Sequence, residues 1–133
     1  MGLFELFGKK PVTSNTVYTM DLETHPFRLN AHKNESVDLT IRLKNTLDKE
    51  LLTSVVVVVQ KPLSTDQTGL TQQREVRIGL LQPGEFKNVV IPIWSTQRTE
   101  PGVYKIKVFA ISHYRDYGHI LNEVRKTIDL RVV

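Results

Sequence analysis

The sequence contains no cysteine, and this absence removes several classes of function at once. Without cysteine there is no disulfide framework, no thiolate zinc site and no cysteine nucleophile. The sequence also lacks a Gly-x-Ser-x-Gly turn, a glycine-rich phosphate loop and a His-Glu-x-x-His pair. We therefore expect a protein that is not an enzyme and that uses no cofactor.

Long hydrophobic segments are absent as well. The longest unbroken apolar run, residues 55–59, is much too short to cross a lipid bilayer. The first eleven residues lack the apolar run and the small-residue cleavage site of a secretory signal. These two absences predict a cytoplasmic protein.

The overall composition is that of one soluble domain of ordinary size. The chain has 133 residues, of which 40% are hydrophobic and 24% are charged, so it can bury a core without covalent cross-links. Its net charge is +4, from 18 basic and 14 acidic residues, and the basic residues are scattered along the chain. Scattered basic residues are typical of a solvated surface, and we expect no binding to nucleic acid.

Alternation of apolar and polar residues is the main structural signal. In residues 35–44, Val37, Leu39, Ile41 and Leu43 alternate with polar residues, as expected of a half-buried strand. The same period occurs in residues 18–22, 76–80, 89–93, 104–110 and 128–132. The run Leu51–Val59 does not alternate and is rich in β-branched residues, which predicts a central strand covered on both faces.

Turn residues separate these segments, and no segment of helical period reaches three turns. Pro62, Pro83-Gly84 and Pro101-Gly102 stand between the apolar segments. We therefore predict an all-β protein, an immunoglobulin-like antiparallel β-sandwich of about seven strands. One core is expected between the two sheets, formed by Val37, Leu39, Ile41, Leu43, Val57, Ile91, Tyr104, Ile106, Val108, Leu130 and Val132.

Four segments resemble the CARDB family, the cell-adhesion-related domain of bacteria and archaea, and related archaeal immunoglobulin-like domains. They are ESVDLTIRLKNT, which contains Asn45, LLQPGEFKNVVIPIW, EPGVYKIKVFA and the final IDLRVV. The resemblance covers roughly residues 18–133 and implies the sandwich fold and an archaeal origin. Its Leu-x-Pro-Gly-Glu and Pro-Gly-x-Tyr motifs mark turns, so they imply no catalytic residue.

The segment 112–119, SHYRDYGH, is the most function-like stretch and is predicted to form the loop before the last strand. Tyrosine and arginine are enriched in binding hot spots, so we identify as candidate binding residues His113, Tyr114, Arg115, Asp116, Tyr117 and His119. In an immunoglobulin-like topology Asn45 lies at the same end and is a further candidate. The alternative is a solvated hairpin without a binding role. A weaker alternative is a metal site formed by His113, Asp116 and His119.

Strand phase predicts an apolar outer face on one sheet. If Val57 and Val108 face the core, then Val56, Val58, Phe109 and Ile111 turn outward, beside Lys105 and Lys107. An apolar outer face normally marks an interface, and the two covers open to it are the N-terminal tail or a second copy of the chain in a homodimer. The alternative is a β-bulge near Ala110 that turns Phe109 into the core.

The N-terminal tail, residues 1–11, precedes the sandwich domain of residues 12–133. Its apolar residues, which include Phe4 and Phe7, can line one side of a short helix before Lys9, Lys10 and Pro11. We therefore expect an interaction or accessory module that binds a protein partner through a sheet face or the 112–119 loop. The alternative is a peripheral membrane protein held at the membrane by this tail.

Overall fold

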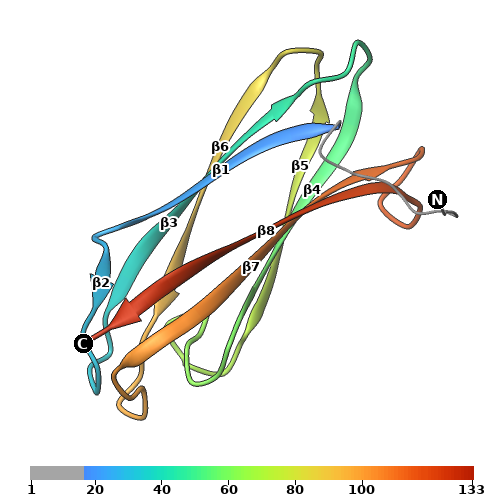
Figure 1. The fold of residues 1–133 in the computed structure, drawn as a ribbon. Helices are drawn as coiled ribbons and strands as arrows, with labels where there is room; N and C mark the ends of the chain where they lie inside the picture. Colours follow the sequence, from blue (N-terminus) through green and yellow to red (C-terminus); the bar gives the residue numbers. More distant parts are fainter. Residues whose placement is uncertain (1–16) are drawn as a thin grey trace, which may run out of the picture.

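The structure, a computed structural model, describes residues 17–133, which form eight strands in two sheets (Figure 1). The strands are β1 (Tyr18–His25), β2 (Arg28–Leu29), β3 (Ser36–Asn45), β4 (Leu51–Val59), β5 (Gln73–Leu81), β6 (Phe86–Trp94), β7 (Gly102–His113) and β8 (Ile120–Val132). The order is β1-β3-β6 in the three-stranded sheet and β2-β8-β7-β4-β5 in the five-stranded sheet. The described residues contain no helix.

The predicted all-β sandwich is confirmed, with one strand more than the seven expected. The additional strand, β2, has only two residues and pairs in parallel with the last residues of β8. All other pairs are antiparallel. Two residues are too few to show a period of two, so alternation in the sequence cannot detect such a strand.

The core lies between the two sheets and contains nearly all the residues expected there. Leu39 and Ile41 of β3, together with Ile106 and Val108 of β7, are fully buried. Burial of each such side chain contributes about 1.5 to 3 kcal/mol to folding. Tyr104 differs from the expectation, because it is half-buried and packs at the margin of the core.

The Tyr104 side chain instead fixes the turn that precedes β7. Its hydroxyl donates a hydrogen bond to the carbonyl oxygen of Glu100 at 2.8 Å, across the Pro101-Gly102 turn. This bond supports the structural role that the Pro-Gly-x-Tyr motif suggested.

Strand β4 is central, as predicted, since it pairs with β5 on one side and β7 on the other. Within residues 17–133, no further layer covers its outer face. Val55 and Val57 are fully buried, whereas Val56 and Val58 on the other face are half-buried. Valine stands on both faces, so the sequence shows no alternation although the burial does alternate.

The two sheets approach each other at one edge, where β1 lies beside β8 (Figure 1). The ammonium group of Lys126 in β8 donates a hydrogen bond to the carbonyl oxygen of Met20 in β1 at 2.8 Å. The Asp21 carboxylate lies 3.9 Å from the same ammonium group. Lys126 therefore bridges the two sheets, and its charge also discourages pairing of another strand at this edge.

Candidate binding surface

The outer face of the five-stranded sheet carries the predicted apolar residues. Val56 pairs with Phe109, Ser54 with Ile111 and Val58 with Lys107 across the β4–β7 ladder. We call Val56, Val58, Phe109 and Ile111 the apolar stripe; all four are half-buried. They form a continuous surface on two neighbouring strands.

The predicted phase of β7 is confirmed. Ala110 is fully buried, so Phe109 and Ile111 on either side of it point away from the core. The pairing of β7 with β8 does shift register, but between Ser112 and His113, past the apolar stripe. The alternative in which a bulge near Ala110 turns Phe109 inward is therefore wrong.

Charged side chains flank the apolar stripe on both sides. Arg125 of β8 lies opposite Phe109, and its guanidinium carbon is 5.2 Å from the centre of the Phe109 ring. The same guanidinium group lies 3.3 Å from the carboxylate of Glu123. On the other side, Glu75 of β5 lies opposite Val56 and 3.7 Å from Arg77.

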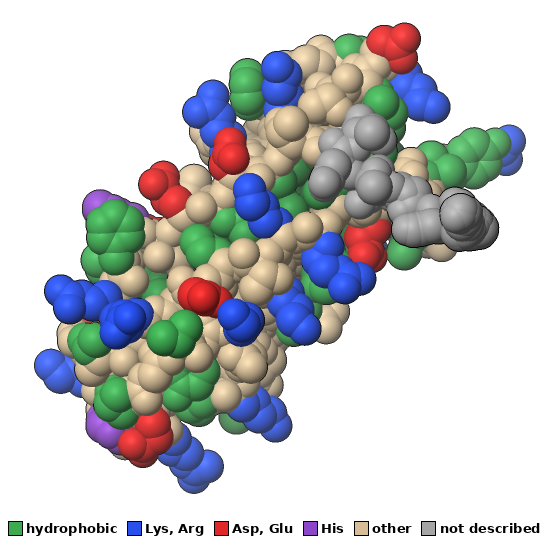
Figure 2. Space-filling view, viewed as in Figure 1, with side chains coloured by type: hydrophobic (Ala, Val, Ile, Leu, Met, Phe, Trp, Pro, Cys, Tyr) green, Lys and Arg blue, Asp and Glu red, His purple; other side chains and the backbone are tan. Residues whose placement is uncertain are grey.

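These exposed ion pairs contribute little to stability, since water screens them. Their effect is to keep both signs of charge beside the stripe. Figure 2 shows the same mixture over the visible side of the molecule, where basic side chains are interspersed with acidic and hydrophobic ones. The sequence gives no sign that Glu75, Arg77, Glu123 and Arg125 lie here, because only strand register places them beside the stripe.

At one end of the stripe a buried histidine joins the outer face to the β7–β8 loop. The Nε2 atom of His113 is 2.7 Å from the hydroxyl oxygen of Ser54 in β4. The Tyr117 ring stands edge-on to the imidazole, with 5.0 Å between ring centres, and Arg77 lies 4.7 Å from the Tyr117 ring. The Nδ1 atom of His113 has no hydrogen-bond partner among residues 17–133.

The loop is consequently shorter than predicted. Ser112 and His113 belong to β7 and are buried, which corrects the expectation that the whole 112–119 segment forms the loop. Tyr114, with 51% of its surface exposed, lies at the tip together with exposed Arg115, while Tyr117 is half-buried. The sequence could not show this, because Ser112 and His113 are polar residues typical of a loop, and only their pairing with Thr53 and Leu52 shows that β7 continues through them.

Hydrogen bonds within the loop order its tip. The Asp116 carboxylate accepts hydrogen bonds from the backbone N–H of Gly118 at 2.9 Å and from Nδ1 of His119 at 2.8 Å. The bond from His119, followed by the bond from Gly118, lowers the pKa of the Asp116 carboxyl below its ordinary value. The tip therefore presents Tyr114 and Arg115 on a hydrogen-bonded turn.

The three residues considered as a metal set are not brought together. His113 points toward Ser54, while Asp116 and His119 pair with each other at the loop tip. Within residues 17–133, no group of three His, Cys, Asp or Glu side chains has a metal-binding arrangement. Phe4 and Phe7, the candidates in the tail, lie outside the described residues.

Asn45 lies at the same end of the sandwich but is fully buried. Its Nδ2 group donates hydrogen bonds to the carbonyl oxygens of Lys49 at 2.8 Å and Leu81 at 2.9 Å. Its Oδ1 atom accepts a hydrogen bond from the backbone N–H of Leu47 at 2.8 Å. The side chain is thus occupied within the fold, where it joins β3 to the end of β5.

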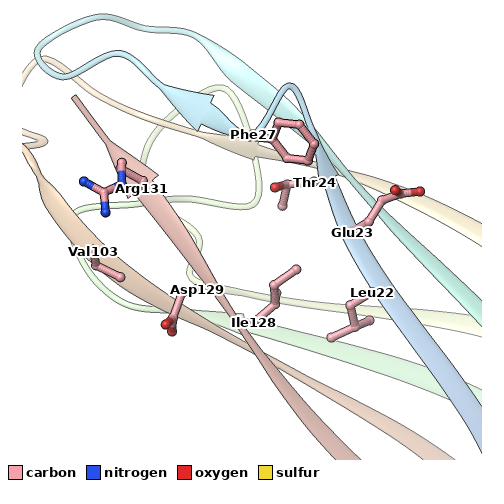
Figure 3. Close-up of a pocket in the computed structure, with 8 residues that line it drawn as sticks. All are labelled: Leu22, Glu23, Thr24, Phe27, Val103, Ile128, Asp129 and Arg131. Carbon is pink, nitrogen blue, oxygen red and sulfur yellow. The ribbon is translucent and has the colours of Figure 1, made fainter.

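A second surface feature is a shallow groove of about 480 Å³ between β1 and β8 (Figure 3). Leu22 of β1 and Ile128 of β8 line its floor, and exposed Phe27 and Val103 stand at its rim. This groove could not be predicted from the sequence, because it depends on how two strands distant in sequence approach each other. Its charged side chains, Glu23, Asp129 and Arg131, are all exposed, and its other polar side chain, Thr24, is buried.

The comparisons with known proteins show the fold and no more. No protein-family model and no curated protein matches the sequence. Among solved structures, a fragment of alpha-2-macroglobulin from Escherichia coli matches with a TM-score of 0.62 and 18% identity, over 90% of this chain and 17% of that chain. The present chain thus spans a small part of that protein.

Two single domains match over nearly their whole length. The CARDB domain of a Pyrococcus furiosus protein, solved with di-metal ions, has a TM-score of 0.55 and 19% identity, over 93% of this chain and 95% of that one. The ASH/PapD-like domain of human CEP192 has a TM-score of 0.51 and 13% identity, over 100% and 96% of the two chains. From Val17 onward, the chain forms no helix suited to spanning a membrane. The two-sheet arrangement and these similarities identify the chain as an immunoglobulin-like β-sandwich, similar in structure to CARDB and PapD-like domains.

Proposed function

We propose that the protein is a non-enzymatic interaction module that binds a protein partner through the outer face of the five-stranded sheet. The observation that carries this proposal is the apolar stripe, which lies on two central strands with no covering layer among the described residues. An apolar sheet face beside arginine and other charged residues has the composition of a protein interface. The tip residues Tyr114 and Arg115 extend this surface at one end.

The buried Ser54–His113 pair supports an interaction role better than a catalytic one. A serine hydroxyl 2.7 Å from an imidazole nitrogen has the spacing of a nucleophile and its base. However, Ser54 is fully buried and only 6% of the His113 surface is exposed, so a substrate cannot reach the hydroxyl. We assign the pair to positioning the end of β7 against β4.

The experiment compares two phenylalanines on opposite sheets. Phe109→Glu places a charge in the apolar stripe, whereas Phe86→Glu makes the same change in β6, where Phe86 is 48% exposed and lies 4.5 Å from Arg42. In affinity purification from the native organism, we expect the wild type and Phe86→Glu to retain a partner that Phe109→Glu loses. Circular dichroism of both variants checks that they are folded.

Equal recovery of the partner by all three proteins would contradict the proposal. Recovery lost in both variants would show a loss of folding or a nonspecific effect of charge, and would also contradict it. The substitution Tyr114→Ala then tests whether the loop tip takes part, with a smaller loss expected because this side chain stands at the end of the surface.

Peripheral membrane binding through residues 1–11 stays as the alternative proposal. It predicts that the full chain sediments with phosphatidylglycerol vesicles and that a Phe4→Glu, Phe7→Glu double variant does not. We expect the full chain to remain in the supernatant, because the basic residues are scattered along the sequence and, on the side seen in Figure 2, are interspersed with acidic ones. The cytoplasmic location also stays a prediction.

The finer assignment to the CARDB family is a proposal as well. It is supported by the Leu81 to Glu85 and Pro101 to Tyr104 turn motifs and by the similar structure of a CARDB domain. We extend to this chain the fold of that domain and not its metal ions.

A further inference from the structure

The residues that surround the apolar stripe form rows across the sheet in which the order of charge reverses. Strand register places Glu75, Val56, Phe109 and Arg125 side by side from β5 to β8. The next row on the same face, two residues farther along, is Arg77, Ser54, Ile111 and Glu123. One row therefore runs from acid to base, and its neighbour from base to acid.

Such a face is complementary to a copy of itself. Consider a two-fold axis that lies in the interface, parallel to the strands and midway between β4 and β7. It places β5 of one copy over β8 of the other, and β4 over β7, so each row faces the same row of the second copy. Glu75 then faces Arg125 of the second copy, and Arg77 faces Glu123 of the second copy. Each contact occurs twice, so four pairs of opposite charge enclose the contact between the two stripes.

The apolar residues match in part under the same operation, which also sets Ile111 against Ser54 and Val58 against Lys107 of the second copy. Val56 of one copy faces Phe109 of the other. A third row places Leu80, Leu52, His113 and Ile120 side by side. Its outer members are unusually exposed for large apolar residues, with 56% of the surface of Leu80 and 64% of that of Ile120 accessible. The axis places Leu80 of one copy against Ile120 of the other.

We infer that the partner of the outer face is a second copy of this chain, packed face to face about a two-fold axis along β4 and β7. The inference rests on the proposed function, whose partner it identifies. A different protein with one predominant sign of charge would meet like charge at half of the flanking positions. Only a face with the same reversal of charge satisfies both rows.

A two-fold axis across the strands also pairs opposite charges but fits less well. It would place Glu75 opposite Arg77 of the second copy, and Arg125 opposite Glu123. However, it would set Leu80 against Gln73, which lies at the other end of β5, and buried His113 against Lys107. The axis along the strands avoids both of these mismatches.

The size of the surface predicts a reversible dimer. With strands about 4.8 Å apart and residues about 3.3 Å apart along them, the four strands between Gln73 and Leu80 span about 20 Å by 25 Å, or about 500 Å² per copy. Two copies together bury about 1,000 Å², at the lower end of specific interfaces. We therefore expect monomer and dimer to exchange within the micromolar to millimolar range of concentration.

Complementary charge-swapped chains test the arrangement. In a dimer of Glu75→Arg chains, two guanidinium groups would face each other at both outer contacts of that row. In a dimer of Arg125→Glu chains, two carboxylates would face each other at the same contacts. We expect sedimentation equilibrium to show at least tenfold weaker dimerisation for each variant alone.

An equimolar mixture of the two variants should restore dimerisation. One contact of the mixed dimer joins the two unchanged residues, Glu75 and Arg125, and the other joins the two substituted ones, which again carry opposite charges. Glu23→Arg and Arg42→Glu make the same changes of net charge on the other sheet and should leave dimerisation unchanged.

Each outcome decides between the two proposals. A wild type that stays monomeric up to millimolar concentration, yet binds another protein in a way that Phe109→Glu abolishes, overturns the dimer and leaves the proposed function standing. A wild-type dimer that the mixture fails to restore overturns the axis along the strands. A dimer unaffected by Phe109→Glu and by both charge swaps overturns the inference and places the self-association elsewhere.

Discussion

The two sheets of this sandwich share one core but have opposite outer faces. In the three-stranded sheet, the outer side of the central strand β3 carries Ser36, Asp38, Thr40, Arg42 and Lys44, all polar. In the five-stranded sheet, the outer side of the central strand β4 carries Leu52, Ser54, Val56 and Val58. A central position in a sheet therefore does not require an apolar outer face. The apolar outer face of β4 and β7 is better explained by binding.

The difference extends to the phenylalanine that each outer face pairs with arginine. Phe86 stands at one end of β6, near Arg42 and Lys44 and away from other large apolar side chains of its face. Phe109 stands in the middle of β7, opposite Val56 and two residues from Ile111. Similar contacts between arginine and phenylalanine thus occur in a solvated setting on one sheet and in an apolar one on the other.

The largest expected effect tests whether the two sheets depend on the same core. Leu39→Ala in β3 and Ile106→Ala in β7 each remove a fully buried aliphatic side chain. We expect each to lower the free energy of unfolding by roughly 2 to 5 kcal/mol, because the cavity closes only in part. Urea denaturation followed by circular dichroism measures the loss.

The control is Val90→Ala, on the outer face of β6, where 54% of the side chain is exposed. It should change the free energy of unfolding by no more than about 0.5 kcal/mol. If only one of the two buried substitutions were destabilising, the sheets would not share a single cooperative core. An unchanged melting temperature in both would show that the assigned strand phase is wrong.

The contrast between the faces also shows what the sequence could reveal. Alternation identified the phase of β3 and β7, because apolar and polar residues differ clearly there. It could not assign β4, where valine occupies both faces, or β2, which has two residues. The stripe was predictable from the phase of β7 together with the pairing of β4 and β7.

What the sequence could not reveal is the surroundings of the stripe. Glu75 of β5 and Arg125 of β8 are 50 positions apart in the sequence, and register alone brings them into one row. The pairing of β4 with β5 shifts register between Thr53 and Ser54, and that of β7 with β8 between Ser112 and His113. These irregularities have no signature in a single sequence. Nor does the pairing of Leu52 with His113, so His113 was placed in the loop and its contact with Ser54 was missed.

A smaller effect is expected at Asn45, which joins the sheets at one end. Asn45→Ala removes three hydrogen bonds, among them the one to the carbonyl oxygen of Leu81 in β5. We expect a loss of roughly 2 to 3 kcal/mol, because buried backbone groups lose their partners. Asn88→Ala, at an exposed position of β6, is the matched control and should be nearly neutral in the same denaturation assay.

Loss of partner binding by Asn45→Ala without loss of stability would contradict this structural role. In that case Asn45 would belong to the binding surface, as the sequence analysis first suggested. A loss of stability with unchanged binding by the folded fraction is the result that the buried hydrogen bonds predict.

The smallest effect concerns Tyr18, whose hydroxyl lies 2.6 Å from that of Thr53 and links β1 to β4 through the core. Burial raises the pKa of Tyr18 to about 12, and the hydrogen bond with Thr53 acts in the opposite direction. The unfolded chain loses this proton near its ordinary pKa of 10.0, whereas the folded protein retains it. The stabilising contribution is therefore fully present below pH 10 and is lost as the pH rises through about 12.

Tyr18→Phe isolates this contribution, because the variant keeps the ring and removes the titrating group. At neutral pH we expect the variant to be less stable by about 1 kcal/mol, the usual value of one buried hydrogen bond. Between pH 10 and 12 the wild type should lose stability more steeply than the variant, so the two curves converge. Rapid urea denaturation at intervals across this range measures the difference between the two proteins, in which the titrations of lysine and of the other tyrosines cancel. Parallel curves would show that Tyr18 reaches water in the folded protein, and the two sheets would then be less tightly joined at this end than their common core implies.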